Sequence, residues 1–257
     1  MELIIVCAVA LLASLLTLFS GFGLGTLLMP VVALFFPLEV AIGMTALVHL
    51  ANNLFKVALL GKHAVWSVLL RFGVAAVLAA FVGAWVLGWL AQSSQPLSYE
   101  MWGYQGQTTW LNVIVGGLIL VFVLLEFSKT FAHIKLGPQF LPLGGTISGF
   151  FGGLSGHQGA FRSMFLLKAG LSKEQFVATG VMVAVMVDVA RLTVYGQDLV
   201  ANHDQVDWVL VISASLAAFA GAFIGKKVLQ KVTIKTVHVA VSLLLVVVAL
   251  GLVSGLI

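Results

Sequence analysis

A glycine-rich stretch at residues 152–162 carries the densest group of polar side chains within an apolar region. Its glycines allow the chain to turn and let the backbone approach a ligand. The helix expected after the turn would offer free N–H groups at its positive dipole end, which suits an anion. Ser155, His157 and Gln158 add hydrogen-bond donors, and Arg162 adds a cation whose fork matches an oxyanion. The stretch predicts an anion site, with close helix packing by its glycines as the alternative.

A second glycine-rich stretch, residues 21–26, is similar but poorer in donors. We expect Gly25 and Thr26 to shape the cavity, and packing alone is again the alternative. Pro30 and Pro37 are expected to bound the half-helix that follows.

Polar residues also line one face of the apolar helix expected at 39–60, because their spacing follows the helical period. A polar face of this kind is not expected to contact lipid. Lys56 would attract an anion, or would instead form an intramembrane pair or reach toward the interface. The residues on this face are Thr45, His49, Asn52, Asn53 and Lys56.

A later helix carries Asp188, Arg191 and Tyr195 on one face. Asp188 and Arg191 stand three residues apart and can pair, and Arg191 would also attract an anion. Asp188 and His49 are the candidate proton carriers, because ionisable groups inside membranes are usually functional. Cationic residues outnumber the one intramembrane carboxylate, Asp188, which argues against a metal cation as substrate.

The composition of the chain excludes several classes of protein. Of the 257 residues, 61% are hydrophobic and 9% are charged, against roughly 25% charged in a soluble domain. This excludes a soluble enzyme and a disordered chain. The single cysteine, Cys7, excludes a disulfide framework and a thiolate metal site, and no cofactor motif occurs. The basic residues behind the net charge of +4 are scattered, so we expect no nucleic-acid partner.

The chain is thus predicted to be an all-α polytopic membrane protein whose partner is the lipid bilayer. A spanning helix needs roughly 20 apolar residues. Candidate spans are 3–19, 39–60, 67–91, 110–128, 173–195, 207–226 and 237–257, and two further stretches broken by glycine are 20–36 and 143–169.

Loop charges orient these spans. Lysines occur in the loops 61–66, 129–142 and 226–236, which we place inside, and the loops 91–109 and 196–207 lack Lys and Arg. The N-terminus is then cytoplasmic and the C-terminus periplasmic. The two broken stretches become re-entrant hairpins, giving about seven full spans plus two hairpins. If both stretches cross fully, about nine spans result.

The two halves of the chain resemble each other. Residues 20–22 match 148–150, and residues 78–84 match 216–222. Matching loops carry opposite charge character, so the repeat is expected to be inverted, which is typical of secondary transporters. The predicted division is 1–92 for the first repeat, 93–109 for an external loop, 110–230 for the second repeat and 231–257 for an extra C-terminal transmembrane helix.

Residues 20–26, 49–56, 148–162 and 179–196 resemble the TauE/SafE family of sulfite exporters. The resemblance covers most of the chain. It implies export of sulfite or a small organosulfonate across the bacterial inner membrane by a secondary transporter.

Two other functions are compatible with parts of the sequence. One is a transporter of a different small anion, or a permease that works as an importer. The other is an intramembrane serine protease of the rhomboid type, because residues 153–156 read G-x-S-G, and His49 with Asn53 gives H-x-x-x-N. The base would then be His238, which lies between two valines, and the inverted repeat is foreign to that class. We therefore expect no enzyme and no catalytic residue.

The resulting hypothesis is alternating access around an anion held near the midplane between the repeats. A homodimer is left open by the sequence. The expected substrate-binding residues are Arg162, His157, Gln158, Ser155, Gly156, Asn52, Asn53, Lys56, Arg191, Gly25 and Thr26, and the expected coupling residues are Asp188 and His49.

Overall fold

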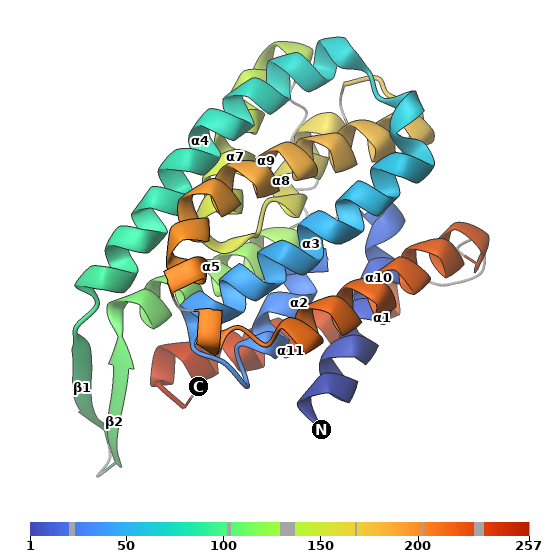
Figure 1. Cartoon of the computed structure of the whole chain (residues 1–257). Coiled ribbons are helices and arrows are strands. Elements are labelled where there is room, and N and C mark those ends of the chain that lie inside the picture. The colour runs from blue at the N-terminus through green and yellow to red at the C-terminus, as the bar shows by residue number, and fades with distance from the viewer. Residues whose placement is uncertain are drawn as a thin grey trace.

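The chain folds as a bundle of helices with one β-hairpin at one end (Figure 1). The computed structural model describes residues 1–20, 24–101, 104–128, 137–167, 169–201, 203–228 and 234–256. The elements are α1 (Glu2–Ser20), α2 (Leu24–Val32), α3 (Leu38–Leu60), η1 (Gly61–His63), α4 (Trp66–Ser93), β1 (Pro96–Met101), β2 (Tyr104–Thr109), α5 (Trp110–Phe127), η2 (Pro138–Phe140), α7 (Leu141–Ser155), α8 (Gly159–Leu166), α9 (Lys173–Ala201), η3 (His203–Gln205), α10 (Trp208–Val228) and α11 (Ile234–Ser254).

The predicted apolar spans all form helices, so the expectation of an all-α polytopic membrane protein is confirmed. Within the described ranges, four helices are long and apolar enough to cross a bilayer, and three shorter apolar helices accompany them. The four are Leu38–His63, Trp66–Ser93, Lys173–Gly196 and Trp208–Gly225.

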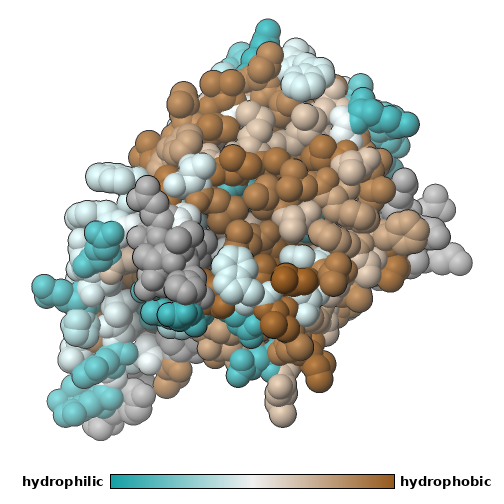
Figure 2. Space-filling model, in the orientation of Figure 1, coloured by the Kyte–Doolittle hydropathy of each residue, from teal (hydrophilic) through white to brown (hydrophobic). Residues whose placement is uncertain are grey.

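The outer faces of α4 and α10 are apolar. Leu78 and Trp85 of α4 are 64% and 65% exposed, and Leu216 of α10 is 61% exposed. Figure 2 shows hydrophobic residues over most of the middle of one face, with hydrophilic residues gathered toward the β-hairpin end and the opposite edge. Contiguous apolar surface of this kind is costly in water and is matched by lipid.

Helix α7 packs along α4 through glycines. A Cβ added at Gly145, Gly149 or Gly153 of α7 would overlap the backbone of α4, so only glycine allows the two helices to come this close. Gly83 of α4 likewise meets the carbonyl of Phe150. The seam, called here the α4–α7 seam, pairs Gly145, Gly149 and Gly153 with the backbone at Phe72, Ala76 and Ala80.

Helix α10 packs along α1 in a comparable way. Gly221 lies against the backbone carbonyl of Leu11, again too close for a side chain. Gly221 and Gly83 occupy corresponding places in the sequence match between residues 78–84 and 216–222. Each half of the chain thus packs a helix of this matched pair onto a helix of the other half, as an inverted repeat would, and the repeat boundaries stay a prediction.

The first broken stretch differs from its expected form. Residues 24–32 form one short helix, α2, and Pro30 lies inside it rather than at its start, so the expectation that Pro30 bounds a half-helix is wrong. The proline removes only one backbone hydrogen bond, to the carbonyl of Thr26, and the turn continues with Ala33 N donating to Met29 O at 2.9 Å. Residues 21–23 lie outside the described residues.

The predicted external loop contains a β-hairpin. Strands β1 and β2 pair antiparallel with Pro96 opposite Thr109. The hairpin is fastened to the end of α11, where Tyr99 Oη donates to Ser254 O at 2.5 Å and Thr108 Oγ1 donates to Leu252 O at 2.9 Å. The bond from Tyr99 supplies a partner to a carbonyl of the last helical turn, and the bond from Thr108 adds to the one that Leu252 O already accepts from Gly255 N at 3.1 Å.

The α4–α7 seam predicts the effect of adding a methyl group. Gly149→Ala should destabilise the protein by about 1–3 kcal/mol, because its Cβ meets the backbone of Ala76. Gly88→Ala in α4 is the matched control, since a Cβ there has open space. Thermal unfolding in detergent measures both. Equal melting temperatures for the two variants would contradict the close packing of Gly149 on α4.

Candidate functional site

Asp188 joins α3 and α9 at the middle of both helices. Its Oδ2 lies 2.6 Å from His49 Nδ1 and accepts from Asn53 Nδ2 at 3.2 Å. Its Oδ1 accepts from Arg191 Nε at 3.0 Å, so the pairing predicted from the i, i+3 spacing is confirmed. All four side chains are buried. We call this group the Asp188 cluster.

The break between α7 and α8 lies beside this cluster. Helix α7 ends at Ser155, and Gly156 follows with φ of 79°, a left-handed conformation that favours glycine. Ser148 Oγ donates to Gln158 O at 2.9 Å and ties the break back to α7. Tyr195 of α9 donates to Gly153 O and ties α7 to α9.

Both glycine-rich stretches approach the Asp188 cluster. A Cβ on Gly156 would lie 2.9 Å from Arg191 Nη1. A Cβ on Gly25 would lie 3.7 Å from Gly156 O and 3.7 Å from His49 Cδ2. Thr26 follows in α2 and is buried. The start of α2 and the α7–α8 break are therefore brought together at the point where α3 and α9 meet.

Arg162 lies in the first turn of α8 and is 8% exposed. Its Nη1 donates to Gln158 Oε1 at 3.2 Å. Its charge interacts through space with Asp188 and with Lys56. Gly180 of α9 lies beside the guanidinium, since a Cβ there would be in ordinary van der Waals contact with Arg162 Nε at 3.5 Å.

Asn52, one of the expected substrate-binding residues, contacts two other helices and Lys56. The side-chain amide is assigned in the orientation in which both its nitrogen and its oxygen have partners. The nitrogen then donates to Ser14 Oγ at 2.9 Å and to Ala218 O at 3.3 Å. Its oxygen accepts from Lys56 Nζ at 3.1 Å. Asn52 thus joins α3 to α1 and α10 and holds Lys56. The role of Ser14 was missed, since a lone serine in an apolar run carries no sequence signal.

His157 is held by the backbone just before it. Its Nδ1 lies 2.9 Å from Ser155 O and 3.1 Å from Ser155 Oγ. Its ring stacks on Phe122 of α5 with ring centroids 5.4 Å apart, and Phe151 and Phe161 pack around Phe122. Phe122 is a second residue that the sequence did not single out, because it is one of many apolar residues in α5.

The buried charges do not balance. Among the described residues, the buried charged side chains are Lys56, Arg162, Arg191 and Asp188. Asp188 pairs with Arg191, whereas Lys56 and Arg162 donate hydrogen bonds to the neutral amides of Asn52 and Gln158. Cations inside a membrane protein without a counter-charge cost several kcal/mol each, so this arrangement is suited to an anion. No group of three or more potential metal ligands occurs within the described part of the chain.

The geometry gives no support to the serine protease alternative. His49 and Asn53 bind Asp188 rather than Ser155. His157 Nδ1 donates to the carbonyl of Ser155, so it is not placed as a base for that hydroxyl. The side chain of His238 lies outside the described residues.

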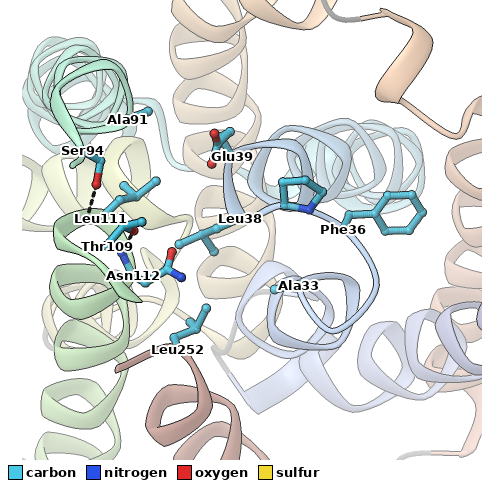
Figure 3. A pocket seen from close by; sticks show the side chains of 11 residues that line it. Ala33, Phe36, Leu38, Glu39, Ala91, Ser94, Thr109, Leu111, Asn112 and Leu252 are labelled. Carbon is cyan, nitrogen blue, oxygen red and sulfur yellow. Dashed lines mark hydrogen bonds between the residues drawn. The ribbon is translucent and has the colours of Figure 1, made fainter. Parts of the chain in front are cut away.

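A pocket of about 280 Å³ lies at the β-hairpin end of the bundle (Figure 3). Its polar lining includes Glu39, Ser94, Thr109 and Asn112. Two of these are engaged locally, since Ser94 Oγ accepts from Leu111 N at 3.1 Å and Thr109 Oγ1 accepts from Asn112 N at 3.2 Å. None of the expected anion-binding residues lines it, so the pocket is separate from the Asp188 cluster.

Gly156 should be intolerant of a side chain for two reasons. Gly156→Ala should cost about 1–2 kcal/mol for the left-handed conformation and about 1–3 kcal/mol more for contact with Arg191. Gly170→Ala is the control, because Gly170 has φ of 72° but open space around its Cα. Chemical unfolding should show the larger loss for Gly156→Ala. Equal losses would mean that the Arg191 contact does not matter.

The family model described as sulfite exporter TauE/SafE matches residues 6–252. No curated protein and no solved structure matches the chain. The match covers nearly the whole bundle, including both glycine-rich stretches and the Asp188 cluster. The chain therefore belongs to the TauE/SafE family of sulfite exporters, which are membrane anion transporters.

Proposed function

We propose that this chain exports sulfite or a small organosulfonate across the bacterial inner membrane as a secondary transporter. The observation that carries the proposal is the buried positive charge of Lys56 and Arg162, whose hydrogen-bond partners within the described residues are neutral amides. A compact oxyanion placed between them would replace lost hydration with charge-assisted hydrogen bonds. The family match supports the same substrate class.

The proposed site combines residues from both halves of the chain. Arg162, Gln158 and Arg191 would donate to the anion, and Lys56 would add its field from α3. Ser155 Oγ already donates to Phe151 O at 3.3 Å, so its part would be through the backbone near Gly156. Asn53 would act by orienting Asp188, and Asn52 by holding Lys56.

Alternating access is the proposed mechanism. The α4–α7 seam and the α1–α10 contact are close packings, and in this mechanism each pair of helices would move as a unit. The substrate residues lie where these units meet, on α3, α8 and α9. Rocking of one unit against the other would expose the anion to one side at a time. The proposed orientation places the N-terminus in the cytoplasm and the C-terminus in the periplasm.

Sulfite flux in proteoliposomes tests the substrate and the site together. Arg162→Ala should lower flux about 10–100-fold, because a hydrogen bond to a charged group contributes about 1.5–3 kcal/mol. Arg71→Ala is the matched control, since Arg71 is exposed on α4. Equal flux in Arg162→Ala and Arg71→Ala would show that the anion does not bind at Arg162 of α8. Competition by sulfate, thiosulfate and sulfoacetate would then rank the anions.

Asp188, with His49, is the proposed coupling group. A proton taken up by the Asp188 carboxyl would release Arg191 and add to the buried positive charge, so anion binding should strengthen as pH falls. Asp188→Asn should remove this part of the pH dependence of flux. Asp207→Asn, at the exposed start of α10, is the control. A folded Asp188→Asn protein with the wild-type pH profile would end the coupling role.

A further inference from the structure

Polar side chains without partners concentrate around the α7–α8 break. Within the described ranges, five buried side-chain atoms have no hydrogen-bond partner, and four of them belong to this region. Leaving such an atom unpaired costs about 1–3 kcal/mol, so a cluster of them indicates a place kept for a ligand. The four are Thr45 Oγ1, His157 Nε2, Gln158 Nε2 and Arg191 Nη2, and the fifth, Ser242 Oγ, lies in α11.

Two of these atoms are donors with a settled orientation. Gln158 Oε1 accepts from Arg162 Nη1, which turns Gln158 Nε2 away as an open donor. Arg191 Nη2 is ion-paired with Asp188 Oδ1 at 2.8 Å, but it carries two hydrogens, so one N–H is left to donate elsewhere. Both donors suit the oxygens of an anion.

His157 presents the opposite chemistry. A carbonyl oxygen only accepts, so the 2.9 Å contact with Ser155 O requires the hydrogen to be on Nδ1. In the neutral imidazole Nε2 is then a lone-pair acceptor. This atom is buried and has no donor among the described residues, and stacking on Phe122 covers one face of the ring. The sequence had suggested that His157 acts as a donor.

The charges around His157 favour the neutral ring. Arg191 of α9 interacts with it directly through space. The other charged and titratable groups of this region are Asp188 and Tyr195 of α9, His49 and Lys56 of α3, and Arg162 of α8. Cations already exceed carboxylates among these groups, so an imidazolium would add to an unbalanced positive charge in a membrane interior.

We propose that His157 Nε2 accepts a hydrogen bond from the transported anion, so that the site selects an oxyanion that still carries one proton. The inference rests on the proposed function and narrows its substrate. Sulfite takes up a proton near neutral pH, whereas sulfate and simple alkanesulfonates hold none there. The open donors Gln158 and Arg191 take the remaining oxygens. This proton is separate from any on Asp188, whose carboxylate already has partners on both oxygens.

Such a site rejects anions without a proton. A ligand that lacks the donor leaves a buried acceptor unpaired, and this lowers its binding affinity. The loss of affinity is larger than the loss caused by a missing apolar contact. Sulfate has the size and the charge for the cationic residues, but it would leave His157 Nε2 unpaired. His157 is thus a specificity-determining residue that separates hydrogensulfite from sulfate.

Two substitutions separate the acceptor from the rest of the ring. His157→Asn keeps a donor near Nδ1 for the Ser155 carbonyl and removes the acceptor at Nε2. His157→Gln places an amide oxygen near Nε2 and cannot titrate. The measurement is sulfite flux into proteoliposomes across a pH series that spans the second ionisation of sulfite, with inhibition by sulfate measured at one fixed pH.

Wild type and His157→Gln should follow the hydrogensulfite fraction and resist sulfate. In His157→Asn the preference for sulfite over sulfate should fall tenfold or more, about 1.4 kcal/mol, and flux should cease to follow that fraction. Unchanged sulfate resistance in a folded His157→Asn protein, or wild-type flux that rises with the dianion, would overturn the inference alone. Absence of sulfite flux in wild type at every pH would overturn sulfite as the substrate in the proposed function, and the inference with it, and would leave an organosulfonate as the substrate of the proposed function.

Discussion

The carboxylate of Asp188 is the point on which the rest of the bundle depends. It is fully buried and is balanced by Arg191 on its own helix and by His49 and Asn53 on α3. Removing one partner of a buried ion pair typically costs about 3–5 kcal/mol, because the other charge stays in a medium that cannot solvate it. The cluster therefore fixes how α3 and α9 cross, and with it the place where the α7–α8 break comes to lie.

Around this polar centre the helices are held by close contact rather than by charge. In lipid there is no hydrophobic gain from joining two apolar helices, so association relies on van der Waals packing. The glycines of α7 on α4, and Gly221 on α1, shorten the distance between backbones and maximise that packing. The buried charged residues in the middle therefore set the register of the helices, and the glycine seams at the flanks set how closely the helices pack.

Local spacing predicted part of this arrangement well. Apolar run length located the helices, and the three-residue separation of Asp188 and Arg191 predicted their pairing. Contacts between segments that are distant in the sequence were harder to predict, because apolar helices of similar composition can pack against one another in many ways. The bond of Asn52 to Ser14 belongs to this class. The β-hairpin at 96–109 was missed because a polar, aromatic loop resembles an interfacial segment. The acceptor at His157 was missed because the tautomer depends on a backbone carbonyl two residues away.

The fastening of the hairpin to α11 has a consequence for how the protein is made. Tyr99 and Ser254 are 155 residues apart, and Thr108 and Leu252 are 144 apart. Contacts of such long sequence separation form late, because most of the chain must be in place first. During synthesis the hairpin would stay unattached beside the membrane until α11 is inserted, and only then could Tyr99 and Thr108 donate to the carbonyls of Ser254 and Leu252. This contact would therefore close late in assembly, and a chain that stops before Leu252 would lack both hydrogen bonds.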